Sequence, residues 1–345
     1  KAMKHLNAIQ CVCFILLLCG CGNNDKTDKT FDVRKNVVNV KKKIVEISTE
    51  PIDISNFGLP FILNEYLLIS DYNSPDKLIH IFNKNTFEYL TSIGERGEGP
   101  GEIINMGNIE SNEKERTFYV IDHGRQKILD YSIDSVLVNP SYLPKEKAAI
   151  RKLEFPISFQ YVNDTLSFAL FFKVLNNNDY KPIVSKWNMQ TGQIDYMDYE
   201  GHPQIKKKRV SFAASAKYDI YVEAYWHNEL MSLGSTDGHF KYNIYGKNWN
   251  DENNNRNRYF GDVVFCKDKI VTSYLGGENI SNINGNLKGN YPTKLLIFNL
   301  EGDYQATLEM GYPMIRFCYD ESKNRIIFAF DNEMQFGYLD MEGMI

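Results

Sequence analysis

The sequence lacks the short motifs that identify the common catalytic and metal sites. It contains no His-Glu-x-x-His run, no paired-cysteine zinc pattern, no Asp-rich calcium loop and no Gly-x-Ser-x-Gly turn. Its histidines are scattered, and a lone histidine is usually structural. A site can also be assembled from distant segments, so the missing motifs do not exclude an enzyme. The sequence does not identify a catalytic residue.

An excess of basic residues is also missing. The chain has 39 Lys and Arg against 44 Asp and Glu, a net charge of −5. Nucleic-acid binders usually present a basic domain, so we predict no nucleic-acid partner. Aromatic residues make up 13% of the 345 residues, which suits β-strands, and closed all-β folds often reach this length as one domain.

The apolar run from Ala8 to Leu18 is too short to span a membrane as a helix and is typical of a secretion signal. It ends in Leu18-Cys19-Gly20-Cys21, which resembles the signal of bacterial lipoproteins. The resemblance implies cleavage before Cys21, because small Gly20 precedes it and Leu18 stands three positions before it. Cleavage before Cys19 would place bulky Leu18 at the cleavage position. The alternatives are an ordinary secreted protein and a short hydrophobic anchor.

This interpretation divides the chain into a signal peptide (1–20), an acylated Cys21 with a flexible polar tether (21–42) and a folded domain (43–345). Several acyl chains, palmitate among them, would hold the protein on a membrane. We therefore expect a lipid-anchored protein of the bacterial cell envelope, at the outer membrane, with the side of that membrane left open.

Two cysteines follow residue 21. Cys266 and Cys318 each follow a phenylalanine in comparable strand-like segments, and the compartment outside the inner membrane is oxidising, so a disulfide is one interpretation. We favour two buried free thiols, because free cysteine behaves as a small hydrophobic residue.

From residue 44 onward the chain repeats roughly every 50 residues. A first marker is an apolar run that starts at Leu67, Phe118, Leu166, Ile220, Ile270 and Ile326. A second marker, a strand end followed by a polar hairpin turn, comes after each of them, at Phe82, Tyr131, Trp187, Leu233, Phe298 and Leu339.

Units of this length with about four strands are propeller blades. We predict an all-β fold, a six-bladed β-propeller with four-stranded antiparallel blades. The sixth unit ends soon after its third strand, and a strand over 43–48 is left over at the start. We expect this N-terminal strand to complete the last blade and close the ring without an open edge.

The glycine-rich run from Ser92 to Ile103 joins the first repeat to the second. Its four glycines and Pro100 exclude a strand or helix interior. It does not suit phosphate, because Pro100 removes a donor, three glutamates would repel the anion and no helical pattern follows. Two interpretations stay open, a structural turn and a binding face that includes Glu95, Arg96, Glu98 and Glu102.

The segment Phe118-Tyr-Val-Ile-Asp-His-Gly-Arg-Gln-Lys-Ile128 resembles the strand–turn–strand unit of NHL-type and TolB-like propellers. The loop Ile-Gly-Glu-Arg-Gly-Glu-Gly-Pro-Gly-Glu-Ile resembles that of TolB-like six-bladed propeller lipoproteins of the Bacteroidetes. The lipoprotein leader agrees with this group. The motif is strong in repeats one and two only, which leaves blade boundaries in repeats three and four open.

Propellers place the loops between second and third strands, and those between blades, on one face. Here these loops are long, and long loops on a rigid scaffold often carry binding sites. The candidate binding residues are Glu95, Arg96, Glu98, Glu102, His123, Arg125, Trp226 and His227. Each has a structural alternative: Trp226 at a strand end is more often a packing residue. Asp71, Asp122 and Asp331 recur at equivalent strand ends, where each would accept N–H bonds in its own turn or bind a cation.

Two functions follow. The first is a non-catalytic binding or assembly module for a protein or glycan, which uses the loop-rich face. The second is a hydrolase or lyase with an acid-lined, calcium-assisted site at the central channel. We favour the first and predict no catalytic residue, no cofactor and no metal ligand, with calcium as the ion that the second would need. Three or more acids or histidines converging at the channel mouth would favour the enzyme.

Overall fold

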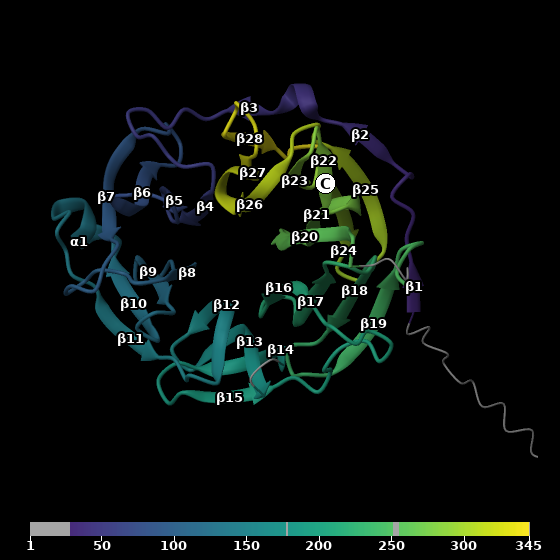
Figure 1. The fold of residues 1–345 in the computed structure, drawn as a ribbon, viewed down its shortest axis with the longest axis horizontal. Coiled ribbons are helices and arrows are strands. Elements are labelled where there is room, and N and C mark those ends of the chain that lie inside the picture. The colour runs from purple at the N-terminus through teal and green to yellow at the C-terminus, as the bar shows by residue number, and fades with distance from the viewer. Residues whose placement is uncertain (1–27, 177–178, 251–254, 345) are drawn as a thin grey trace, which may run out of the picture.

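The computed structural model describes residues 28–176, 179–250 and 255–344, which form a ring of six β-sheets around a central axis (Figure 1). Each sheet is a blade with four antiparallel strands, as the sequence predicts. Blades 1 to 3 consist of β4 (Gly58–Leu63), β5 (Tyr66–Asp71), β6 (Lys77–Asn83), β7 (Tyr89–Glu95); β8 (Met106–Asn112), β9 (Thr117–Asp122), β10 (Lys127–Ser132), β11 (Lys145–Ala149); and β12 (Glu154–Asn163), β13 (Leu166–Asn176), β14 (Asp179–Asn188), β15 (Gln193–Tyr196).

Blades 4 to 6 continue the ring in chain order. They consist of β16 (Val210–Ser215), β17 (Ile220–Tyr225), β18 (Leu230–Gly234), β19 (Phe240–Tyr245); β20 (Asn257–Cys266), β21 (Lys269–Glu278), β24 (Lys294–Asn299), β25 (Tyr304–Glu309); and β26 (Met314–Asp320), β27 (Arg325–Phe330), β28 (Phe336–Asp340) with β3 (Val45–Glu46). A separate hairpin, β22 (Ile280–Ile283) and β23 (Asn286–Gly289), is inserted between β21 and β24. The helical segments are η1 (Lys41–Lys43), α1 (Ile133–Val138) and η2 (Glu321–Lys323).

The second strand of every blade carries the first repeat marker, and the third strand carries the second marker. Second strands read as nearly continuous apolar runs because each is buried on both faces between neighbouring blades. The described hydrophobic residues accordingly form six clusters, one at each junction between blades. The ring is therefore held by side-chain packing around its whole circumference.

Ring closure also follows the prediction. The N-terminal strand β3 pairs antiparallel with β28, through Val45 with Tyr338 and Glu46 with Gly337. The last blade thus takes its fourth strand from the start of the chain, and the closing edge is paired.

The N-terminal segment corrects one expectation. Instead of a flexible tether up to residue 42, the chain from residue 28 follows the outside of the ring (Figure 1). β1 (Asp28–Thr30) pairs parallel with β19, and β2 (Val37–Asn39) pairs parallel with β25. Phe31 packs edge-on against Phe298, at a centroid distance of 5.4 Å. We call residues 28–46 the belt; they add a fifth strand to blades 4 and 5 before closing blade 6. The signal peptide and Cys21 lie outside the described residues.

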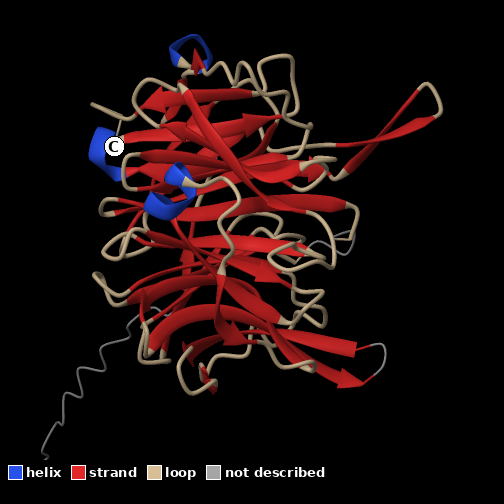
Figure 2. Cartoon of the chain, turned by 90° about the vertical axis from the view of Figure 1, so that its left-hand side faces the viewer, coloured by secondary structure: helices blue, strands red, loops and turns tan. Residues whose placement is uncertain are grey.

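The two faces of the ring differ in their loops. The connections between second and third strands, and those between blades, form what we call the loop-rich face. Two long hairpins, β13–β14 and β22–β23, project from it (Figure 2). The opposite face carries mainly short turns. Within the described ranges, no helix is long and apolar enough to cross a membrane.

Candidate functional site

A cavity of about 1130 Å³ runs along the axis of the ring. The six inner strands line it, namely β4, β8, β12, β16, β20 and β26. Its lining includes Tyr72 and Trp226 at the loop-rich face and Glu113 and Ser322 in turns of the opposite face. The cavity is therefore a channel that extends between the two faces, and a ligand could contact side chains from every blade.

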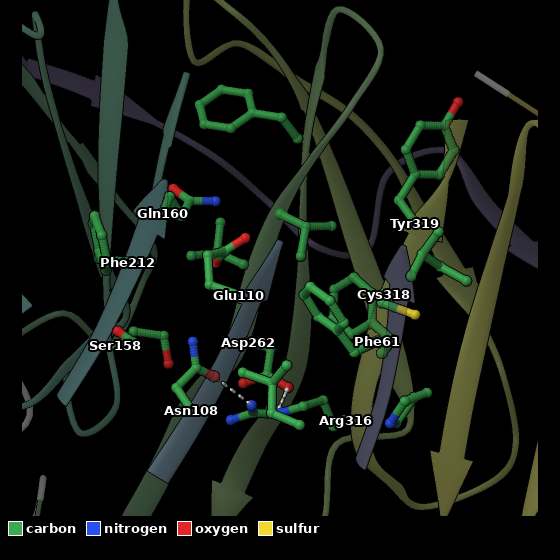
Figure 3. A pocket seen from close by; sticks show the side chains of 18 of the residues that line it. Phe61, Asn108, Glu110, Ser158, Gln160, Phe212, Asp262, Arg316, Cys318 and Tyr319 are labelled. Atoms are coloured by element: carbon green, nitrogen blue, oxygen red, sulfur yellow. Dashed lines mark hydrogen bonds and ion pairs between the residues drawn. The ribbon is translucent and has the colours of Figure 1, made fainter. Parts of the chain in front are cut away.

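Near the loop-rich face, three polar side chains converge from three different inner strands (Figure 3). Arg316 of β26 places Nε 3.4 Å from Oδ2 of Asp262 on β20. The same guanidinium donates through Nη1 to Oδ1 of Asn108 on β8, at 3.5 Å. Asp262 raises the pKa of Arg316 by its charge. Both contacts are longer than a strong charge-assisted hydrogen bond, so this triad is loosely held.

A second arginine stands at the same end of the channel. The guanidinium of Arg258 lies over the indole ring of Trp226, 4.8 Å from its centroid, and its Nε donates to the carbonyl of Phe260 at 3.4 Å. The indole Nε1 donates to Oγ of Ser211 at 2.8 Å, which fixes the ring. Burial lowers the pKa of Arg258, and Asp262 partly offsets this by attraction. Arg258 stays charged, because guanidinium cannot be deprotonated in proteins.

Glu110, on β8 two residues beyond Asn108, points into the channel (Figure 3). Burial raises its pKa from the ordinary 4.5 to about 8, and the charge of Glu113 adds to the shift. The N–H of Ser111 donates to its carboxyl at 3.2 Å and opposes the shift. At neutral pH Glu110 is consequently protonated and able to donate a hydrogen bond.

The other end of the channel carries a tighter ionic cluster, at the junction of blades 6 and 1. Asp320 accepts hydrogen bonds from Nζ of Lys84 at 2.9 Å, Nε of Arg325 at 3.1 Å and Oγ of Ser322 at 2.7 Å. Asp320 is fully buried, and the side chains of Lys84 and Arg325 are 8% and 9% exposed. Burial raises the pKa of Asp320, but its hydrogen bonds outweigh that effect and the pKa is lowered. This cluster therefore links the last blade to the first by a buried ion pair.

Three of the four glycine-loop candidates make contacts within the protein, and one of these contacts stays inside the loop. Lys77 pairs with Glu95, and Arg96 donates to the carbonyl of Tyr72. Glu102 accepts a hydrogen bond from the N–H of Gly99 at 2.6 Å, and Glu98 is exposed. Arg96 and Glu102 thus contact the protein's own backbone, and Glu95 and Glu98 are exposed; both sequence interpretations, the structural turn and the binding face, stay predictions.

The remaining candidates are spread around the same face. Arg125 donates to the carbonyl of Gly99 at 2.6 Å, which joins it to the glycine loop. His123 packs against Phe155 at a centroid distance of 5.9 Å, and burial lowers its pKa. Nδ1 of His227 contacts the carbonyl of Asn257 at 2.8 Å. Of the eight candidates only Trp226 lines the channel.

The recurring aspartates build turns at two of their three positions. Asp122 accepts backbone N–H bonds from Asn105 at 3.0 Å and Gly124 at 3.0 Å, and Asp71 accepts one from Ser55 at 2.8 Å. Asp331 differs, because its carboxylate pairs with Lys288 at 3.4 Å. Cys266 and Cys318 are free thiols. Among the described residues, no three His, Cys, Asp or Glu side chains come together in a way that could hold a metal ion.

Sequence reasoning missed the channel residues Asn108, Glu110, Asp262, Arg258 and Arg316. One signal was present, because polar residues two positions apart in a first strand must share a face, as Asn108 and Glu110 do. Nothing in the sequence says which of these faces meet across the axis.

Taken together, the fold and its channel define a six-bladed β-propeller. The chain belongs to the family DUF5128, described as a 6-bladed beta-propeller, whose model matches residues 49–275. No curated protein matches the sequence.

Solved structures of similar shape are distant in sequence. A putative exported protein from Bacteroides fragilis is 13% identical, with 91% of this chain and 98% of that chain covered and a TM-score of 0.55. A DUF4221 member from Bacteroides vulgatus is 10% identical, with 86% and 94% covered and a TM-score of 0.56. A luciferin-regenerating enzyme is 8% identical, with 86% and 94% covered and a TM-score of 0.55. Such low identities establish the shared fold alone.

Proposed function

We propose that this propeller is a non-catalytic binding or assembly module that holds a protein or glycan on its loop-rich face. The observation that carries the proposal is a set of exposed apolar side chains on the loops and hairpins of this face. On this face stand Phe57, Ile104, Leu153, Leu175, Tyr180, Ile280, Ile283 and Leu287. Three of them share the hairpin β22–β23, and an exposed apolar patch rimmed by polar residues marks an interaction site.

The projecting hairpin β22–β23 adds to this argument. It is a two-stranded sheet of its own, and Ile280, Ile283 and Leu287 on it are more than half exposed. An isolated hairpin with uncovered apolar side chains is marginally stable in water. A partner that covers these side chains would stabilise it, which favours an interaction at this site.

The test is a pull-down from envelope extracts with matched surface variants. Leu287, 76% exposed on the hairpin, is replaced by Ser together with Ile280→Ser; Val138, 87% exposed at the end of α1, is replaced by Ser as the control. We expect the hairpin variant to lose its partner and the Val138→Ser variant to keep it. Equal recovery with both variants would contradict a binding role for the hairpin side of this face.

A hydrolase or lyase is the second candidate, and one observation favours it. Glu110, whose pKa is raised to about 8, shares the channel with Asp262. A carboxyl whose pKa is raised toward neutrality, with a second carboxyl in the same cavity, is a pair that acid–base catalysis could use. Turnover of any polysaccharide or ester substrate that Glu110→Gln abolishes, while folding is unchanged, would replace the binding module by this enzyme.

The lipid anchor and the TolB-like or NHL-like kinship belong to the same proposal. The sequence Leu18-Cys19-Gly20-Cys21 supports acylation of Cys21 and attachment to the cell envelope, at the outer membrane. Metabolic labelling with palmitate tests it in two variants. Cys21→Ser should remove the label, and Cys19→Ser should retain it; label that persists in Cys21→Ser would contradict the anchor.

A further inference from the structure

We propose that the loop-rich end of the channel binds a carboxylate-bearing oligosaccharide, with Arg258 and Arg316 receiving the carboxylate. This inference rests on the proposed binding function and specifies the ligand of the channel mouth.

The first step is the charge at this end of the channel. Two guanidinium groups face one nearby carboxylate, that of Asp262. Oδ2 of Asp262 makes no hydrogen bond, and its contact with Arg316 is 3.4 Å long. In the part of the chain that the structure describes, no carboxylate lies within ion-pair distance of Arg258. Counted over the described residues alone, these groups carry one more positive than negative charge, which a ligand could balance.

The second step is the form of the donors. Stacking on Trp226 holds the guanidinium plane of Arg258, and the contact with Asn108 orients that of Arg316. A planar guanidinium matches the two oxygens of a carboxylate. The two guanidinium groups and Asp262 leave one net positive charge, which a single carboxylate balances, whereas a phosphate dianion would bring an excess of negative charge beside Asp262. A carboxylate is thus a better fit than a phosphate dianion.

The third step is the space around the charged groups. A channel of about 1130 Å³ enclosed by six strands admits an extended chain and excludes a folded domain. Short polar side chains from blades 2 and 3, namely Asn108, Ser158 and Gln160, line it beside Phe61 and Phe212 (Figure 3). Amide and hydroxyl groups next to apolar rings suit sugar hydroxyls and the apolar faces of sugar rings, so we favour a glycan over a peptide.

The experiment is a calorimetric titration of the full chain at pH 7 and low salt. Four probes are compared: oligogalacturonate, neutral oligogalactan of equal length, oligoglutamate and inorganic phosphate. Arg258→Gln and Arg316→Gln are the test variants. Arg34→Gln is the matched control, because Arg34 pairs with Asp32 in the belt, away from the channel. Thermal melting verifies that each variant folds.

We expect oligogalacturonate to bind, the neutral oligomer to bind at least tenfold more weakly, and each channel arginine variant to weaken oligogalacturonate about tenfold to a hundredfold. Arg34→Gln should leave its affinity unchanged. If an arginine variant does not fold, Asp262→Asn serves instead and should tighten oligogalacturonate binding, because it removes the competing carboxylate; a gain in affinity cannot arise from unfolding.

Other outcomes overturn the inference in distinguishable ways. Equal binding of the neutral oligomer, unchanged by the arginine variants, would reject the carboxylate site and leave the proposed binding function standing. Binding of oligoglutamate without oligogalacturonate would show a peptide site, and binding of phosphate alone would show an unspecific anion site. If no probe binds while the pull-down partner depends on the hairpin, the channel inference is wrong and the binding module stands.

Discussion

The two ends of the channel contain the same kinds of residue, but these residues make different kinds of contact. At the closing junction, Asp320 accepts three short hydrogen bonds, and its two basic partners are buried. At the loop-rich end, Asp262 makes one longer contact, with Arg316, and acts on Arg258 only through its charge; one of its oxygens has no hydrogen bond.

This contrast separates charges that stabilise the fold from charges that are available to a ligand. Buried charges are tolerated when every lone pair and proton has a partner, as in the Asp320 cluster. Charged side chains that line the channel and make only long contacts can still form hydrogen bonds with a ligand. We therefore assign the Asp320 cluster to stability and the Asp262 group to recognition.

The largest expected effect is at Asp320. Asp320→Asn would leave Lys84 and Arg325 buried without a carboxylate, so we expect a loss of about 3–5 kcal/mol in the free energy of unfolding, measured by urea denaturation. Its control is Asp340→Asn, at an exposed position. Because the pKa of Asp320 is lowered, its contribution is present above pH 3.8 and is lost as pH falls through the lower folded value. A change below about 1 kcal/mol would remove the contrast between the two ends.

Glu110 should give the next effect, as a slope of stability between pH 4.5 and about 8. Between pH 4.5 and about 8 the folded chain keeps the Glu110 proton and the unfolded chain has lost it, so stability falls as pH rises. Glu110→Gln removes this slope, which amounts to at most about 1.4 kcal/mol per pH unit. Parallel stability curves for the two proteins between pH 5 and 8 would show that Glu110 ionises normally.

Asp262→Asn should change stability far less than Asp320→Asn. Its single long ion pair and partial exposure predict a change of less than about 1 kcal/mol in urea unfolding. A loss comparable to that of Asp320→Asn would assign Asp262 to the structural group and weaken its role in recognition.

The smallest effect is expected from Glu95→Gln. Glu95 pairs with Lys77 on the surface, and exposed pairs contribute about 0.2–1 kcal/mol. Unfolding in low and high salt should show a small difference that salt removes. A larger effect would show that loop-rich surface charges also support the fold.

The sequence allowed the repeat, the blade number and the ring closure to be predicted, because second strands such as 67–71 and 118–122 are buried on both faces and therefore read as apolar runs. The belt escaped prediction, since β1 and β2 are only three residues long and pair with strands far along the chain. The channel group escaped for a related reason: Asn108, Asp262 and Arg316 meet only because the ring closes.

The position of the belt at the start of the chain also affects the order of folding during synthesis. Asn36 of the belt donates a hydrogen bond to the carbonyl of Gln305, 269 positions along the chain. At a synthesis rate of roughly 5–20 residues per second, the belt emerges about 10–60 s before its partner exists. During that interval its exposed valines, Val37 and Val38, have no strand of their own chain to pair with. The first residues of the fold to be made are thus among the last to find their place.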